Sequence, residues 1–340
     1  MDNYIGLDAH SKTCTFVVLD KKGREIRTAK IDTSEKNILG FLSTIQGVKK
    51  LVFEEANLSQ WLYMLLKDKV DELTVCNASY LAKKQGAKND YRDALHLANE
   101  LRCGHVIPVF HDDHPLMRLR TVFSYYTETV KSCTRAKNRV KSILRANGLK
   151  TDSIKKGTFT TSPVIEQLKN PDDQFVSNAL AAQIDLLTQQ KLEFLKIFEE
   201  CRKKYPVIQN LSTIPGVGIV RAVTISSFIC SPERFVNKHK LWSYSMLVSH
   251  IEESDGVIYA KKRKYGRTEL KDAFIGAAEN VNRSDNSLSK YYQHLRSKGL
   301  NHKIARRSVA RRIAAIALKI MKHGGAYDDK HVAKKSKEMI

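Results

Sequence analysis

Residues 4–8 read Tyr4-Ile5-Gly6-Leu7-Asp8, an apolar run that ends in an acid. Short apolar runs bounded by polar residues are typical of buried strands. Two β-rich runs follow at residues 13–19 and 25–31, and the turn Asp20-Lys21-Lys22-Gly23 joins them. The spacing predicts an antiparallel meander whose first strand carries Asp8 at its end.

Strands then alternate with helices. Residues 33–45 begin with a capping sequence and have amphipathic spacing, residues 50–54 return as a short apolar strand, residues 58–66 are helical, and residues 72–76 suit a fifth strand. A meander followed by alternating elements predicts a mixed sheet that is covered on both faces, and hence an α/β fold for residues 1–110.

Four acids occupy the ends of these elements. Asp8 and Glu54 each end an apolar strand, while Asp90 and Asp93 lie one helical turn apart at the start of an amphipathic segment. Carboxylate oxygens in this number are the ligands of Mg²⁺ or Mn²⁺, and such ions can assist phosphoryl transfer. Taken singly, each acid could be a turn or cap residue, and the helix pair could simply suit the helix dipole. Glu55 competes with Glu54, because neighbours on a strand face opposite sides.

The charge of the chain is unevenly distributed. The formal net charge is +22, of which residues 1–110 carry about +2, residues 111–150 about +6, residues 151–205 about zero and residues 206–340 about +14. This excess of cations predicts a protein that binds nucleic-acid phosphates. No apolar run is long enough for a membrane span, and no secretory signal is recognisable, so a cytoplasmic protein without a membrane partner is expected.

A helical arm is predicted over residues 111–205. His114-Pro115 suits a helix start, and the short run from His111 to His114 is better explained by capping than by metal binding. Apolar residues at helical spacing between 176 and 198 predict a second long helix that pairs with the first in an antiparallel coiled coil. The first helix has a basic face, and its candidate nucleic-acid contacts are Arg118, Arg135, Arg139 and Lys141.

Residues 206–325 are predicted to form a second, mostly helical domain. Ile214-Pro215-Gly216-Val217-Gly218 resembles the turn of a helix-hairpin-helix, in which the backbone at Gly216 and Gly218 can approach a phosphate. A basic loop offers further phosphate contacts at Lys261, Lys262, Arg263, Lys264 and Arg267. Residues 326–340 are polar and are expected to form a flexible tail.

These motifs, in this order, resemble the DEDD insertion-sequence transposases of the IS-one-ten family. The resemblance rests on Ile5-Gly6-Leu7-Asp8, Val52-Phe53-Glu54, Asp90-x-x-Asp93-Ala94, the helical arm and Ile214-Pro215-Gly216-Val217-Gly218. It extends over about residues 3–325. It implies a RuvC-like, RNase H-related N-terminal domain with a metal site at Asp8, Glu54, Asp90 and Asp93, a coiled-coil arm and a C-terminal transposase domain.

The resemblance also implies a chemistry. Members of the family carry a nucleophilic serine in the C-terminal domain, and the matching residue is Ser254, with Ser245 and Ser249 as alternatives. Met246 stands where glycine is usual, and Asp255 stands where a glycine would follow the serine. The implied protein is a DNA recombinase of a prokaryotic mobile element, nucleoid-associated in the cytoplasm, guided by a structured bridge RNA. It would hold double-stranded donor and target DNA as a homo-oligomer, from dimer to tetramer.

Two other functions fit the residues. A structure-specific endonuclease of the Holliday-junction resolvase type would use the same four acids and water, without Ser254. A non-catalytic nucleic-acid chaperone would keep the acids for structure alone. Replacing Ser254 or Asp8 separates these hypotheses from the recombinase.

Overall fold

The computed structural model describes the chain except for residues 78–88, 151–162, 249–251, 255–256, 261–265 and 330–340. The chain divides into two compact units, Met1–Asp113 and His114–Ile340. Each unit has its own core, and each is described separately below.

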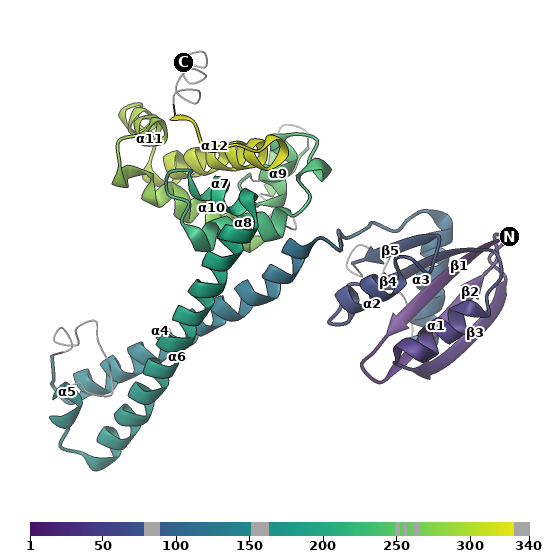
Figure 1. Ribbon diagram of the computed structural model, residues 1–340, viewed down its shortest axis with the longest axis horizontal. Helices are drawn as coiled ribbons and strands as arrows, with labels where there is room; N and C mark the ends of the chain where they lie inside the picture. The colour runs from purple at the N-terminus through teal and green to yellow at the C-terminus, as the bar shows by residue number, and fades with distance from the viewer. Residues whose placement is uncertain (78–88, 151–162, 249–251, 255–256, 261–265, 330–340) are drawn as a thin grey trace. The chain divides into compact units, whose positions relative to one another are not determined.

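The first unit is built on a five-stranded sheet with the order β3-β2-β1-β4-β5 (Figure 1). β1 lies in the centre, pairs antiparallel with β2 and runs parallel to β4, while β2 also pairs antiparallel with β3 and β4 parallel with β5. The mixed sheet and its meander confirm the prediction. The strands are β1 (Asp2–Ala9), β2 (Thr13–Leu19), β3 (Glu25–Asp32), β4 (Val48–Glu54) and β5 (Glu72–Cys76).

Helices cover both faces of this sheet. α1 (Glu35–Ser43) and α2 (Ser59–Leu66) pack on one face, where alternate strand residues such as Ile5, Phe16 and Phe53 form the main core. α3 (Asp90–Cys103) covers the other face and packs against the opposite set of strand residues. Because side chains alternate along a strand, Tyr4, Gly6 and Asp8 share the α3 face.

Gly6 sets the distance between β1 and α3. A Cβ at this position would lie 1.9 Å from the carbonyl oxygen of Ala94 and 2.7 Å from the amide nitrogen of Ala98. Only glycine therefore allows the helix backbone to approach the central strand this closely. The small side chains of Ala94 and Ala98, both fully buried, complete the close approach. The sequence Ile5-Gly6-Leu7-Asp8 thus determines where the first turn of α3 lies relative to Asp8.

The second unit begins with a helical arm. η2 (Pro115–Arg118) leads into α4 (Leu119–Ala146), and the short α5 (Pro163–Glu166) precedes α6 (Pro171–Lys204). His114 caps the start, as its Nδ1 accepts a hydrogen bond from the Leu116 amide. α4 and α6 lie side by side (Figure 1), and Asn147 at the end of α4 donates a 2.8 Å hydrogen bond to Asp173 at the start of α6. The two helices therefore run antiparallel, as the sequence predicts.

A helical bundle forms the rest of this unit. α8 is its central helix, buried from Ala222 to Ile229, and it packs against α4, α6, α7 and α10. Gly216, at φ +83°, ends the turn between α7 and α8, and a Cβ there would lie 2.2 Å from the Ala277 carbonyl oxygen of α10. The helices are α7 (Pro206–Ser212), α8 (Ile219–Ile229), η4 (Pro232–Arg234), α9 (Lys238–Tyr244), α10 (Thr268–Asn280), η5 (Val281–Arg283), α11 (Ser287–Ser297) and α12 (His302–His323).

One small sheet interrupts the bundle between α9 and α10. β6 (Glu252–Ser254) pairs antiparallel with β7 (Val257–Ala260), with Ser254 opposite Val257. The mixed sheet of the first unit and the helical second unit confirm the predicted combination of an α/β and an all-α part.

The start of the predicted tail is attached to the bundle. The Tyr327 amide donates a hydrogen bond to Thr213 Oγ1 at 2.8 Å, and Asp329 accepts one from the Ser287 amide at 2.9 Å. Residues 330–340 of that segment lie outside the described residues.

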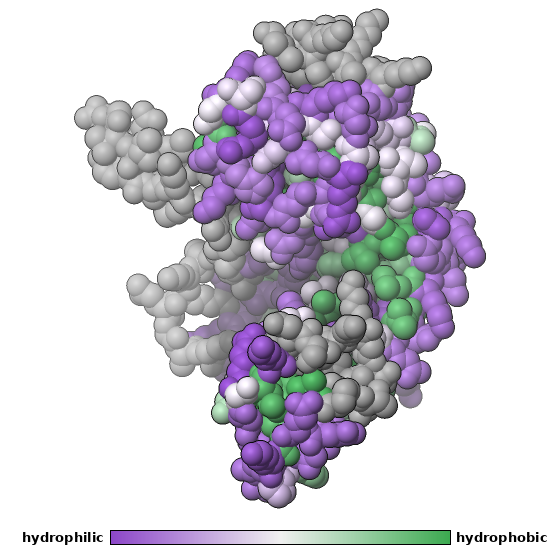
Figure 2. Space-filling view, turned by 90° about the vertical axis from the view of Figure 1, so that its left-hand side faces the viewer, coloured by the Kyte–Doolittle hydropathy of each residue, from purple (hydrophilic) through white to green (hydrophobic). Residues whose placement is uncertain are grey.

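One face of the molecule is largely polar. Figure 2 shows mainly hydrophilic side chains on the face that it presents, with hydrophobic ones in separate patches. Among the helices described, none combines the length and the apolar character needed to cross a membrane.

Candidate metal centre and nucleic-acid contacts

The register of the central strands brings two of the predicted acids to one edge of the sheet. β1 and β4 run parallel with Leu7 opposite Phe53, so Asp8 and Glu54 are the next residues on the two neighbouring strands. By strand alternation both lie on the α3 face. Glu54 is partly buried, whereas Glu55 is exposed and donates its backbone N–H to the Cys76 carbonyl oxygen.

The surroundings of Cys76 indicate on which face of the sheet the Glu54 carboxylate lies. The thiol is buried against Val52 and Leu97, between the sheet and α3. Burial, and secondly the charge of Glu54, raise the pKa of Cys76 to about 12. The Glu54 carboxylate is therefore close to the α3 side of the sheet, the side that also carries Asp8.

The N-terminus of α3 brings the other two acids to the same edge. Asn89 is the N-cap and accepts a hydrogen bond from the Tyr91 amide, so neither Asp90 nor Asp93 has to serve as the cap. The charges of Asp93 and Asp90 both act on Asp8. Burial is the largest cause of the raised pKa of Asp8, and these two negative charges raise it further, against the attraction of His10.

A histidine and a lysine lie against the acids. His10 Nε2 is 3.2 Å from Asp8 Oδ2 and 3.8 Å from Asp90 Oδ1. Lys30 Nζ donates a 2.9 Å hydrogen bond to Asp90 Oδ2, which lowers the pKa of that carboxyl. Lys30 reaches this position because Asp8 pairs with Thr15 and Thr15 pairs with Lys30 across the three strands of the meander.

The arrangement suits a divalent cation. One potential ligand atom from each of Asp8, His10 and Asp90 lies within 4.8 Å of the others. Asp8 Oδ2 is buried and, among the described residues, has no hydrogen-bond partner, although His10 is near. Carboxylate oxygens suit Mg²⁺ or Mn²⁺, and an imidazole nitrogen can join them for a transition metal. The two carboxylates of this group suit the ions predicted from the sequence, while Glu54 and Asp93 are not among the residues whose ligand atoms lie within this distance of one another.

The serine candidates lie in the second unit. Ser254 is the last residue of β6 and lies opposite Val257 of β7. Ser245 is completely buried, and its Oγ has no hydrogen-bond partner in the described part of the chain. Ser249 falls outside the described residues. Of the two serines that the structure describes, Ser254 therefore lies on the two-stranded sheet, whereas Ser245 lies in the buried core.

Met246 lies at the base of the segment that leads to this hairpin. Its φ is +53°, in the left-handed region that side chains other than glycine seldom occupy. Nearby, the Arg267 amide donates a 2.8 Å hydrogen bond to the Tyr244 carbonyl oxygen. Residues 244 and 267 are thereby joined on either side of the hairpin. Glycine would adopt this left-handed backbone with less strain than Met246 does.

The predicted nucleic-acid contacts have mixed surroundings. Arg118 and Arg139 are exposed, Lys141 is half-buried, and Arg135 is exposed and paired with Glu128. Gly216 packs against α10, whereas Gly218 is the N-cap of α8, with nothing within 4 Å of a Cβ built there. Arg267 directs its Nε to the Tyr244 hydroxyl at 3.4 Å. Lys261, Lys262, Arg263 and Lys264 fall outside the described residues.

Sequence reasoning missed three residues that matter to these sites. His10 and Lys30 carry no pattern of their own, although the pairing of the meander could have placed Lys30 in line with Asp8. Arg120 is half-buried and donates to the carbonyl oxygens of Ser227 and Phe228 at the end of α8. An arginine in a basic helix gives no sequence signal for such a structural role.

Two protein-family models match the chain. A model for DEDD-type transposases matches residues 5–147, and a model described as "Transposase IS116/IS110/IS902 family" matches residues 208–293. The first match includes all four acids and α4, and the second includes the α7–α8 turn and the β6–β7 hairpin. No curated protein matches the chain.

Proposed function

Because the chain belongs to the IS110 family of insertion-sequence transposases, named IS-one-ten above, we propose that it cleaves and exchanges DNA strands through a phosphoserine intermediate, with a divalent metal and a guide RNA. Membership of this family makes the protein a DNA-recombining enzyme. The metal, the serine and the RNA are the proposed details.

The observation that carries the proposal is the convergence of acids from separate elements. Asp8 from β1, Glu54 from β4, and Asp90 and Asp93 from α3 lie at one edge of the sheet. Burial is the main cause of the raised pKa of Asp8, and the negative charges of Asp93 and Asp90 raise it further, so gathering these acids costs free energy. A cluster that only stabilised the fold would not need this arrangement, whereas a cation-binding site does.

Asp8, Glu54, Asp90 and Asp93 would hold Mg²⁺ or Mn²⁺. A bound ion of this kind would supply Lewis-acid stabilisation of the charge that develops on the phosphoryl oxygens. In the structure, His10 lies beside Asp8 and Lys30 forms an ion pair with Asp90. We expect both to move away from Asp90 or to contact the DNA phosphate when the ion is present.

Ser254 would supply the nucleophile. Its Oγ attacks the phosphorus of a backbone phosphodiester, the bond from phosphorus to the 3′ oxygen breaks, and the serine proton is transferred so that the strand leaves with a 3′-hydroxyl. A 3′-hydroxyl from the partner strand then attacks the phosphoserine, which reforms a phosphodiester and returns the proton to Ser254. Each step exchanges one phosphoester bond for another, so strand exchange needs no hydrolysis and no external energy source.

The other proposed partners follow from charge and family. The second unit carries the cationic helices. Its proposed contacts with the nucleic-acid backbone are Arg118 at the end of η2 and Arg135, Arg139 and Lys141 on α4. A guide RNA would choose the sequence by base pairing, while the protein holds the RNA and double-stranded DNA through shape and charge. Two DNA sites must be held at once, which is why a homo-oligomer is proposed.

The test is an adduct assay. Purified protein, the RNA transcribed from the flanks of its element and end-labelled DNA are incubated with Mg²⁺ and then separated by denaturing electrophoresis with and without protease. We expect a protease-sensitive protein–DNA adduct that Ser254→Ala and Asp8→Asn both abolish. Ser245→Ala is the control, because Ser245 is buried and should leave the adduct intact.

Other outcomes distinguish the alternatives. Clean cleavage that persists in Ser254→Ala, with no adduct, would establish a metal-dependent endonuclease in place of the serine mechanism. Adduct formation that is equally strong without the RNA would remove the guide from the proposal. Activity that survives in Asp8→Asn would remove the metal centre from it.

A further inference from the structure

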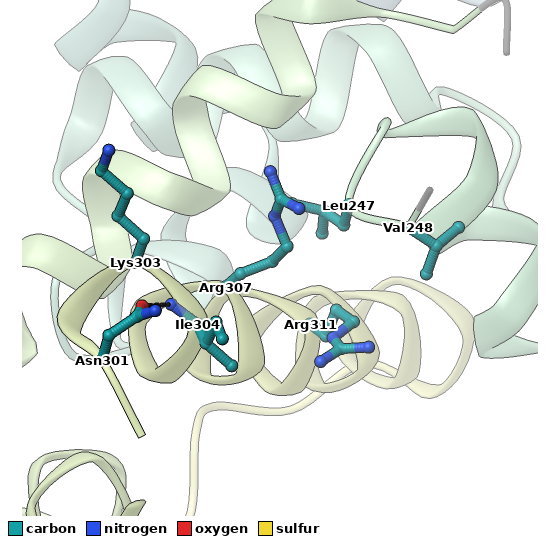
Figure 3. Close-up of a pocket in the computed structure, with 7 residues that line it drawn as sticks. All are labelled: Leu247, Val248, Asn301, Lys303, Ile304, Arg307 and Arg311. Atoms are coloured by element: carbon teal, nitrogen blue, oxygen red, sulfur yellow. Dashed lines mark hydrogen bonds between the residues drawn. The ribbon is translucent and has the colours of Figure 1, made fainter. Parts of the chain in front are cut away.

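A basic pocket lies between α12 and the segment after α9 (Figure 3). Its volume is about 570 Å³, and α12 contributes Lys303, Arg307 and Arg311 to its lining. Leu247 and Val248 face these residues from the other side, and Ile304 adds an apolar side chain, itself 50% exposed. The pocket therefore combines three cations with an apolar wall.

The three cations form one stripe on the helix. Residues 303, 307 and 311 are spaced four apart, which puts them on one face with about 6 Å between successive positions. The stripe spans about 12 Å, close to the rise of three or four nucleotides along a DNA strand. The opposite face of α12 is buried from Ala305 to Ile320, so the stripe is the outward face of a firmly packed helix.

These cations differ from their neighbours on the same helix. Arg306 is paired with Glu279, and Arg312 lies over the Tyr291 ring. Within the described residues, by contrast, no carboxylate forms an ion pair with Lys303, Arg307 or Arg311. The Arg311 guanidinium donates to Ser308 Oγ and lies over the ring of Trp242, whose Nε1 donates to the Arg311 carbonyl oxygen. The stripe is thus a positive surface without a counter-charge from the described protein.

The position of Lys303 is unfavourable for the isolated helix. α12 contains no acidic residue between His302 and His323, and Lys303 lies in its first turn, near the positive end of the helix dipole. A cation there destabilises the helix, whereas an anion bound over the first turn would interact favourably with both the dipole and the side chain. The charge pattern therefore suits an external anion.

We propose that this pocket binds a phosphodiester group of a nucleic-acid backbone. The apolar wall reduces the screening of the cations by water, which strengthens their attraction for a phosphate. The proposal extends the proposed function, because Val248 precedes Ser254 by six residues, and a chain of that length spans at most about 20 Å. A strand held in the pocket would thus have its backbone within reach of the serine hairpin.

The experiment measures binding without chemistry. Fluorescence anisotropy is recorded on the full chain carrying Ser254→Ala, in EDTA, with a labelled DNA duplex of mixed sequence and separately with a labelled single-stranded RNA. The double variant Lys303→Gln/Arg307→Gln is compared with the control Lys203→Gln/Lys319→Gln. The control removes the same charge from two exposed residues of the same unit that do not line the pocket.

We expect the pocket variant to bind about tenfold more weakly than the control. The slope of log K against log salt should fall by about 1.8 for duplex DNA or about 1.4 for the single strand, and the nucleic acid that shows the change is the one that the pocket holds. Equal losses in the pocket and control variants, with either nucleic acid, would reduce the effect to net charge and overturn the proposal. So would an unchanged affinity.

A second measurement locates the phosphate. A set of duplexes, or single strands, each with one neutral methylphosphonate linkage, is titrated against the parent and against the single variant Lys303→Gln. We expect a methylphosphonate at one or two of the linkages to weaken binding by the parent protein. At the same linkages it should not weaken binding by Lys303→Gln any further, because the cation that contacts that phosphate is already absent. Lys303→Gln removes a cation from the first turn, so its melting temperature should not fall, and weak binding could not be ascribed to unfolding. If the loss of affinity from the neutral linkage and the loss from Lys303→Gln were additive at every linkage, Lys303 would not bind a particular phosphate. That result would contradict the proposed site, whatever the outcome of the adduct assay.

Discussion

The two units of this chain differ in how charge is arranged. Residues 1–113 contain 16 Lys and Arg and 16 Asp and Glu, whereas residues 114–340 contain 42 and 20, so the whole formal excess of +22 belongs to the second unit. The first unit is neutral in sum, yet four of its acids lie at one edge of the sheet. The net positive charge therefore favours the second unit for binding a polyanion. The clustered acids favour the first unit for binding a cation that could assist a reaction at a phosphate.

The units also differ in how they hold their proposed functional residues. Asp8 and Glu54 end central strands and Asp90 starts a helix packed tightly on them, so their backbones are held by a continuous core. Ser254 lies on a two-stranded sheet of seven residues, with a left-handed Met246 at its approach. A metal site needs several ligands at fixed separations, whereas a nucleophile that attacks DNA must be able to approach the phosphate of a bulky substrate. The predictions below test this difference.

The largest expected effect follows from Gly6. Gly6→Ala would bring a Cβ to within 1.9 Å of the Ala94 carbonyl oxygen, so α3 must move away from β1. Because backbone atoms make the clash, we expect a loss of about 3 kcal/mol or more in the free energy of unfolding, measured by urea denaturation.

Gly40→Ala is the matched control for this variant. Gly40 is an exposed position inside α1, and a Cβ there would meet nothing within 4 Å. This substitution should stabilise the unit by about 0.5–1 kcal/mol. Similar effects for the two glycines would show that the close packing of α3 does not position the acids.

Metal binding should stabilise the first unit alone. With free Mg²⁺ at ten times its dissociation constant, the native state gains about 1.4 kcal/mol, which calorimetry would record as a higher melting temperature. Asp8→Asn should abolish the gain. Lys30→Gln should tighten Mg²⁺ binding, because it removes the cation that donates to Asp90.

Lys21→Gln serves as the control, since Lys21 lies exposed in the turn before β3. If it tightened Mg²⁺ binding as much as Lys30→Gln, the effect would reflect only the overall charge. A stabilisation by Mg²⁺ that persisted in Asp8→Asn would place the ion elsewhere in the protein.

The strain at Met246 predicts a smaller effect in the second unit. Met246→Gly and Met246→Ala both remove the side chain beyond Cβ, but only glycine tolerates φ +53° without strain. We expect the glycine variant to be more stable than the alanine variant by about 1 kcal/mol in chemical denaturation. An alanine variant as stable as the glycine variant would contradict the left-handed backbone.

The smallest effect concerns pH and has opposite signs for two acids of one cluster. The pKa of Asp8 is raised by burial, so its contribution to stability is complete below the unfolded value of about 3.9 and is lost as the pH rises through the native value. The pKa of Asp90 is lowered by Lys30, so its contribution is present above about 3.9 and is lost as the pH falls through the native value.

Melting temperatures in EDTA between about pH 3 and 7 test these signs. Relative to the unmodified protein, Asp8→Asn should gain stability towards neutral pH and Asp90→Asn should lose it. Changes of the same sign in both variants would mean that the two carboxylates have similar surroundings.

The residues explain why some features were predictable from sequence and others were not. Apolar period, capping residues and acids at strand ends are local signals, so the mixed sheet, the antiparallel arm and the helical second part were predicted and confirmed. The shared face of Asp8 and Glu54 follows from strand alternation once the parallel pairing is known. Lys30 lies beside the acids because Asp8 pairs with Thr15 and Thr15 pairs with Lys30. This register across three strands cannot be predicted from a short stretch of sequence.

By itself, the sequence determined the type of each element, the acids available for a cation and the excess of positive charge for a polyanion, because these depend on residue type and short-range spacing. Only the tertiary structure decided that His10 and Lys30 lie on the acids, that Arg120 holds the end of α8, and that Lys303, Arg307 and Arg311 share a pocket with Leu247. Contacts of that kind join residues far apart in the chain, and they form only when whole elements pack against one another.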